Sequence, residues 1–281
     1  MSFTRIAVLL SVTALLAGCV LPFPKGTEVH QNQSYGAHQR NKLDVFLPEQ
    51  RDTSTETVVL IHGGAWVAGD KAGEELKGIR NRLLGSGFAV ASMNYRYACG
   101  DHLKQMEDVG NALQHLSENA AQWNINSQRF ALLGFSAGGH LALLHGHAFN
   151  QNGLVRTVIS NVGPTDLTDP LLHQSLASYG IMYTLEQLLG ATYAEDSALY
   201  AQASPVFSPS QLPTLLLYGA LDDLVPKEQG IVMFDTLSAF GAVVDTTIPT
   251  LGTHNIYGPN NMYRDQLENE IIDWLHLHLN E

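Results

Sequence analysis

Short apolar runs alternate with helical patterns along most of the chain. The runs are rich in β-branched residues and lack polar alternation, which is typical of strands buried on both faces. They lie at 57–61, 88–93, 130–133, 157–162, 214–218 and, more weakly, 243–248, after two opening strands expected around 35 and at 43–48. Helical patterns occupy 73–85, 103–123, 137–149, 226–240 and 261–279. This alternation predicts an α/β domain with a mostly parallel central sheet and helices on both faces.

Residues 167–203 depart from the alternation, because they hold short helical stretches between two predicted strands. An insertion of this length is often a cap over an active site, and extra packing would leave the same pattern. No repeat or linker divides the rest, so 34–281 is predicted to form one domain.

The first 18 residues have the pattern of a secretory signal, with one basic residue, an apolar run and small residues at the end. Leu16-Ala17-Gly18-Cys19 resembles the lipobox of bacterial lipoproteins. The resemblance implies cleavage before Cys19 and acyl chains on this cysteine, which would anchor the protein to a membrane. The alternative is an ordinary secretory signal with a coincidental cysteine.

Val20 follows the cysteine, where an aspartate would resemble the inner-membrane retention signal. The sequence therefore favours a lipid-anchored protein of the bacterial cell envelope, at the outer membrane if the cell has one. Residues 19–33 contain two prolines and a polar stretch without periodicity, and they are predicted to be a lipidated tether.

The composition is that of a globular protein, with 45% hydrophobic and 15% charged residues among 281. The formal net charge of −12 disfavours binding to nucleic acid, because the phosphate backbone would repel the chain. Two cysteines are too few for a disulfide framework.

Ser136 is the candidate nucleophile. Gly134-Phe135-Ser136-Ala137-Gly138 fits the pattern G-x-S-x-G, and it lies between a predicted buried strand and an apolar helix. Small neighbours leave room for a strained turn that raises the serine hydroxyl into the cleft beyond the strand ends.

A serine nucleophile needs a base, and this kind of turn is followed in chain order by an acid and then a histidine. Asp222 and Asp223 follow the strand at 214–218, and Asp222 is favoured as the acid because it begins the pattern D-x-x-V-P. Among 12 histidines, His254 alone comes at the right place in this order.

The sequence His62-Gly63-Gly64-Ala65-Trp66 directly follows the first buried strand. Acyl transfer forms an oxyanion, which backbone N–H groups must stabilise. The N–H groups of Gly63, Gly64 and Ala137 are therefore the candidate oxyanion hole. Alone, the two glycines would indicate only a tight turn.

These motifs together resemble the α/β-hydrolase serine esterases, in particular the carboxylesterase, acetyl-esterase, feruloyl-esterase-like, kynurenine-formamidase-like and hormone-sensitive-lipase-like branch. The resemblance runs from about residue 42 to 279, through HGGAW at 62–66, GFSAGGH at 134–140 and GALDDLVP at 219–226. It implies that Ser136 is the nucleophile, His254 the base and Asp222 its orienting carboxylate. His62 is expected to brace its loop.

The expected reaction is hydrolysis of small-molecule carboxylic esters, with short acyl chains, through an acyl-enzyme. No metal or cofactor is expected. Amide hydrolysis, as in a formamidase or peptidase, remains open, as do a lipase and a non-catalytic envelope lipoprotein. The natural acyl and alcohol groups and the oligomeric state do not follow from the sequence.

Overall fold

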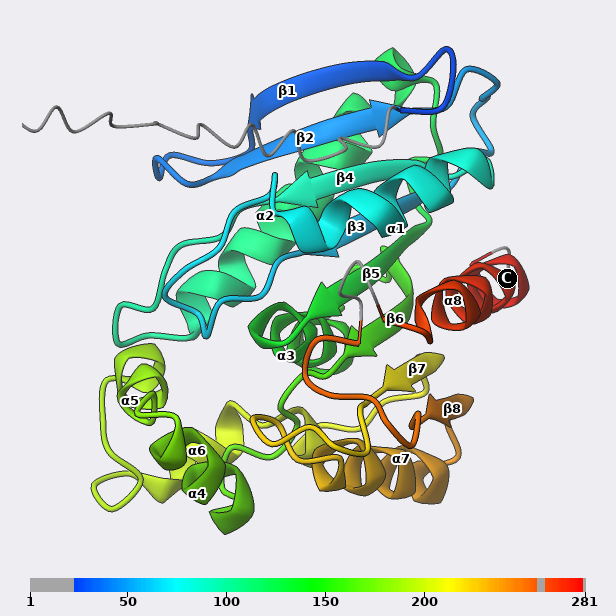
Figure 1. Ribbon diagram of the computed structural model, residues 1–281. Helices are drawn as coiled ribbons and strands as arrows, with labels where there is room; N and C mark the ends of the chain where they lie inside the picture. Colours follow the sequence, from blue (N-terminus) through cyan, green and yellow to red (C-terminus); the bar gives the residue numbers. More distant parts are fainter. Residues whose placement is uncertain (1–22, 257–260, 280–281) are drawn as a thin grey trace, which may run out of the picture.

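A computed structural model describes residues 23–256 and 261–279, and these form one eight-stranded sheet flanked by helices (Figure 1). The strand order is β1-β2-β4-β3-β5-β6-β7-β8. The two opening strands are antiparallel, and the strands from β3 to β8 run parallel to one another. The strands are β1 (Glu28–Ser34), β2 (Lys42–Leu47), β3 (Thr57–Ile61), β4 (Ala89–Met93), β5 (Phe130–Phe135), β6 (Val155–Asn161), β7 (Thr214–Leu217) and β8 (Val244–Thr247).

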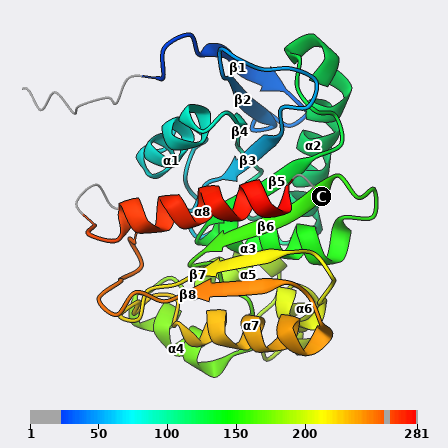
Figure 2. The ribbon, with the colours of Figure 1, turned by 90° about the vertical axis from the view of Figure 1, so that its right-hand side faces the viewer.

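Both faces of the sheet are covered, as the uninterrupted apolar runs predicted (Figure 2). Val59 and Ile61 of β3 point to the core under α2, α3 and α7, whereas Val58 and Leu60 point to the core under α1 and α8. These helices are α1 (Glu74–Gly85), α2 (Leu103–Trp123), α3 (Ala137–Leu144), α7 (Glu228–Phe240) and α8 (Arg264–His278). None of the described helices is long and apolar enough to cross a bilayer.

The helical pattern predicted at 137–149 covers two kinds of helix. The α-helix α3 ends at Leu144, and His145–Phe149 continues it as a turn of π-helix. The buried residues of this turn are His145, Gly146 and His147.

The prediction that residues 19–33 form a tether is wrong for residues 28–33. These residues belong to β1, which pairs with β2 from Glu28 opposite Leu47 to Ser34 opposite Lys42. An edge strand is held by backbone hydrogen bonds on one side, so a polar sequence forms it without an apolar signature. Phe23 also packs on Phe46, with 5.4 Å between ring centroids. The predicted signal, Cys19 and the first part of the tether lie outside the described residues.

Residues 167–203 form three short helices, which lie together at the lower left of Figure 1. They are α4 (Pro170–Ser178), α5 (Tyr183–Leu189) and α6 (Ser197–Gln202). Leu172, Leu185 and Leu188 are fully buried and join the core shared by α2, α3 and α7. The insertion is therefore packed onto the main core and does not have a core of its own.

The turn between β5 and α3 leaves no room for side chains beyond that of Ser136. A Cβ atom on Gly138 would lie 2.2 Å from the carbonyl oxygen of Ile61 in β3. This atom belongs to the backbone of a central strand, so it cannot move aside as a flexible side chain could.

We expect Gly138→Ala to lower the free energy of unfolding by about 3 kcal/mol, because the new methyl group overpacks the turn against β3. Gly85→Ala is the matched control. No atom lies within 4 Å of a Cβ at this exposed helical position, so the substitution should raise the stability by about 0.5 kcal/mol. Urea unfolding of both variants measures the difference, and equal stabilities would contradict the packing argument.

Candidate active site

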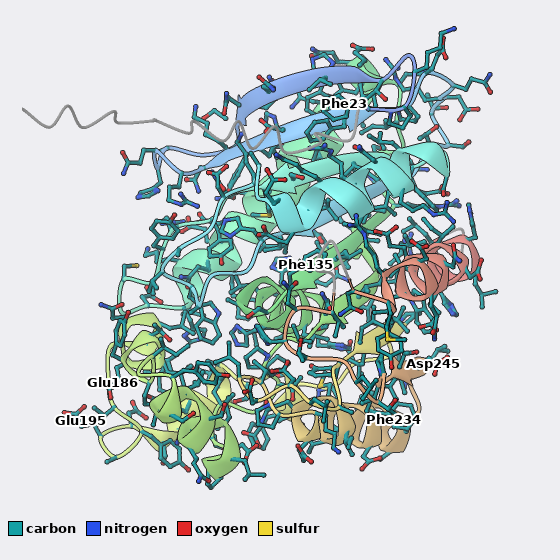
Figure 3. The ribbon with its side chains drawn as sticks, in the orientation of Figure 1. Phe23, Phe135, Glu186, Glu195, Phe234 and Asp245 are labelled. Atoms are coloured by element: carbon teal, nitrogen blue, oxygen red, sulfur yellow. The ribbon has the colours of Figure 1, made fainter. Side chains whose placement is uncertain are left out.

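Ser136 occupies a strained turn at the carboxyl end of β5, directly after Phe135, which Figure 3 labels. Its backbone has φ 53° and ψ −119°, in a region that non-glycine residues rarely adopt. The Ser136 N–H donates to the carbonyl oxygen of Asn161 in β6 over 2.8 Å. The Ser136 carbonyl accepts from the His140 N–H, in the first turn of α3, over 3.0 Å. These two bonds hold the serine between β6 and the helix.

The structure brings the three predicted residues together. The distance from His254 Nε2 to Ser136 Oγ is 3.0 Å, and the distance from His254 Nδ1 to Asp222 Oδ2 is 2.8 Å. Because a carboxylate only accepts, Nδ1 carries the proton and Nε2 is left to accept the serine hydroxyl. The arrangement can remove a proton from Ser136.

Asp222, and not Asp223, contacts the histidine. The Asp222 side chain is fully buried, and its second oxygen, Oδ1, accepts the N–H groups of Leu224 and Val225 at 3.0 and 2.8 Å. These two bonds fix the carboxylate through Oδ1 and leave Oδ2 for His254. Asp223 is exposed, as a loop residue.

Gly63 lies beside the serine, and Gly64 lines the same cavity. A Cβ on Gly63 would be 3.3 Å from the Cβ of Ser136, so any larger residue here would push its neighbours aside by a few tenths of an ångström. Within the described part of the chain, the N–H groups of Gly63, Gly64 and Ala137 donate to no acceptor. The three predicted donors are thus unengaged and available to a ligand oxygen at this point.

His62 braces the loop, as expected from the sequence. Its ring stacks on Tyr95 with 4.4 Å between centroids, and the Tyr95 hydroxyl donates to the His62 carbonyl over 3.2 Å. Burial lowers the pKa of His62 to about 4, so the ring is neutral at pH 7. Arg40 adds a bond from its guanidinium to the Gly69 carbonyl over 3.0 Å.

A buried chain of hydrogen bonds that the sequence reasoning missed links the loop to the insertion. Trp66 Nε1–H donates to His140 Nδ1 over 3.1 Å, and His140 Nε2–H donates to the Ala203 carbonyl over 2.8 Å. Burial lowers the pKa of His140 to about 4, which keeps Nδ1 free of a proton and able to accept. Both residues belong to motifs that the sequence shows, HGGAW and GFSAGGH, but their contact does not follow from either motif.

A cavity of about 540 Å³ opens in front of Ser136 and His254. Its apolar wall includes Val162, Leu224 and Ile181, and α5 adds Tyr183 and Thr184, so the insertion forms one side of the cavity.

Asn161 also lines this cavity, and the sequence analysis did not single it out. Its Oδ1 is buried and has no hydrogen-bond partner in the part of the chain that the structure describes. Over the same residues, no group of three or more His, Cys, Asp or Glu side chains could hold a metal ion.

The strand order, the turn at Ser136 and the Ser-His-Asp arrangement define an α/β-hydrolase, which confirms the predicted fold. The chain belongs to the BD-FAE family, whose model matches residues 43–237.

Curated relatives carry esterase names. A probable isoprenylcysteine alpha-carbonyl methylesterase of Oryza sativa subsp. japonica is 27% identical over 89% of this chain and 63% of its own length. An acetylxylan esterase of Xylanibacter ruminicola is 26% identical over 82% of this chain and 47% of its own length. The chain thus spans less than two thirds of these relatives.

Solved structures support the fold. A truncated carbohydrate esterase from gut microbiota matches with a TM-score of 0.75 and 23% identity, over 88% of this chain and 96% of that one. Esterase B from Lactobacillus rhamnosis matches with a TM-score of 0.72 and 21% identity, over 92% of this chain and 88% of that one.

We expect Asp222→Asn to slow covalent labelling of Ser136 by an organophosphonate about 10³-fold or more, because an amide can favour the wrong tautomer of His254. The measurement is the rate of label incorporation at pH 7. Asp223→Asn removes the same charge from the neighbouring exposed residue and should stay within about twofold of the unmodified protein. Equal rates for the two variants would show that Asp222 does not orient the histidine.

Proposed function

We propose that this protein is a serine esterase that hydrolyses small carboxylic esters with short acyl chains. The observation that carries the proposal is the hydrogen-bonded series from Ser136 through His254 to the buried Asp222, at the edge of a cavity. The esterase names of the curated relatives support the same chemistry.

In the first half of the reaction, His254 Nε2 takes the proton from the Ser136 hydroxyl as Oγ attacks the ester carbonyl. The negative charge that develops on the carbonyl oxygen is stabilised by backbone N–H groups of Gly63, Gly64 and Ala137. His254 then gives its proton to the departing alcohol. An acyl group remains on Ser136.

In the second half, His254 removes a proton from water, and the resulting nucleophile attacks the acyl-enzyme. The same N–H groups stabilise the second oxyanion, and the acid leaves as Ser136 regains its proton. Asp222 keeps its charge throughout and stabilises the protonated ring of His254.

The cavity of about 540 Å³ has room for a small ester. Val162, Leu224 and α5 of the insertion line it together with the loop of Gly63 and Gly64. The names of the two curated relatives also describe small groups at the cleaved bond, an acetyl group in one and a methyl group in the other.

We expect the protein to cleave p-nitrophenyl acetate and butyrate at least tenfold faster, in kcat/KM, than the octanoate and palmitate. Ser136→Ala should lower kcat on the short esters about 10³-fold or more, because the nucleophile and its base act as a unit. Release of p-nitrophenol is the measurement. Undiminished turnover by the variant would remove Ser136 from the mechanism.

We also propose that Cys19 is lipidated and anchors the protein in the bacterial cell envelope, with the outer membrane favoured. The support is the lipobox-like sequence at 16–19 and the valine at position 20. Two or three acyl chains would make the anchor stable, whereas a single chain would bind reversibly.

In a Gram-negative host, we expect Cys19→Ser to abolish incorporation of radioactive palmitate and to remove the protein from the membrane fraction. Cys99→Ser is the matched control, because Cys99 is an exposed free cysteine of the folded domain. It should retain the label and remain with outer-membrane markers on a density gradient. Palmitate on the Cys19 variant would place the anchor elsewhere.

A further inference from the structure

Glu75 lines the active-site cavity, and its carboxylate lies close to Gly73, the residue before α1. It lies in the first turn of α1, immediately after the loop that carries Gly63 and Gly64, and it lines the cavity with these glycines and His254. It is half-buried, and within residues 23–256 and 261–279 it makes no hydrogen bond or ion pair. Its neighbour Glu74 is exposed and pairs with Lys77.

The N-terminus of α1 offers Glu75 partial positive charge, but a carboxylate without an ion-pair partner here is still unfavourable for the proposed reaction. Negative charge develops on the ester carbonyl oxygen beside Gly63 and Gly64, and a second negative charge in the same cavity raises the energy of that state. A substrate that brings a positive charge would remove this penalty and would gain an ion pair in a partly desolvated place.

Tyr183 adds a second group suited to a cation. It lines the cavity from α5, and the residue is 50% exposed, so a ligand in the cavity can reach it. The faces of aromatic rings attract ammonium groups, most strongly where water is partly excluded. The net charge of −12 also draws cations toward the protein and repels anions.

We propose that the site selects esters that carry an ammonium group, which the Glu75 carboxylate and the Tyr183 ring hold. Glu75 is thus a specificity-determining residue, separate from the groups that break the ester bond. This inference rests on the proposed esterase function, which it narrows to cationic substrates.

Two pairs of esters with the same shape test it. Acetylcholine is compared with 3,3-dimethylbutyl acetate, and betaine methyl ester with methyl 3,3-dimethylbutanoate, so the charge lies on the alcohol in one pair and on the acyl group in the other. We expect Glu75→Gln to lower kcat/KM for at least one cationic ester about tenfold, as the loss of a nearby charge predicts. Its neutral counterpart should keep its value or gain up to threefold.

Comparing each ester between protein and variant cancels the different intrinsic reactivities of the cationic and neutral compounds. Glu74→Gln is the matched control, because it makes the same change in net charge away from the cavity. It should leave all four values within about twofold. Retained turnover of the neutral esters by Glu75→Gln shows that the variant is folded.

The inference is overturned if Glu75→Gln changes both members of each pair by the same factor, or if Glu74→Gln reproduces its effect. In either case hydrolysis of the neutral esters, abolished by Ser136→Ala, would leave the proposed function standing. A protein that cleaves none of the four esters or the p-nitrophenyl esters would overturn the proposed function, and the inference with it.

Discussion

The turn at Ser136 constrains the whole centre of the molecule. Ser136 has a positive φ, Gly138 packs against the backbone of β3, and the Ser136 N–H is bonded to β6. The turn therefore locks β5 to both of its neighbours in the sheet. The strain that exposes the hydroxyl is balanced by packing that extends across three central strands.

The remaining groups gather around this turn because parallel strands end at one edge of the sheet. His254 lies 118 positions after Ser136 in the chain, yet their side chains are 3.0 Å apart. Asp222 follows β7, the strand next to β6, and two backbone N–H groups fix its carboxylate locally. Once the sheet has formed, little further conformational entropy is lost in bringing these side chains together.

Much of this arrangement could be predicted, since buried strands and the motifs that follow them leave local patterns. Val58 to Ile61 are apolar in an unbroken run because successive side chains enter opposite cores. Residues 28–33 were wrongly predicted to be part of a tether, because an edge strand such as β1 needs backbone partners but no apolar face. The link from Trp66 to His140 joins positions 74 residues apart, and Glu75 lines the cavity because the loop before α1 brings the helix to it. Both are contacts between segments, which no local pattern records.

The buried histidines make the stability of the fold depend on pH. Burial lowers the pKa to about 4 from an ordinary 6.5 in four histidines, namely His62, His140, His145 and His147. Between pH 4 and 6.5 these histidines bind protons in the unfolded chain but not in the native protein. Their effect on the free energy of unfolding is therefore absent above pH 6.5, and it lowers that free energy as the pH falls toward 4. Each ring contributes about 1 kcal/mol per pH unit in that interval. These four histidines therefore lower the stability of the native state as the pH falls from 6.5 toward 4, and protonation of His140 Nδ1 would remove the acceptor of the Trp66 hydrogen bond.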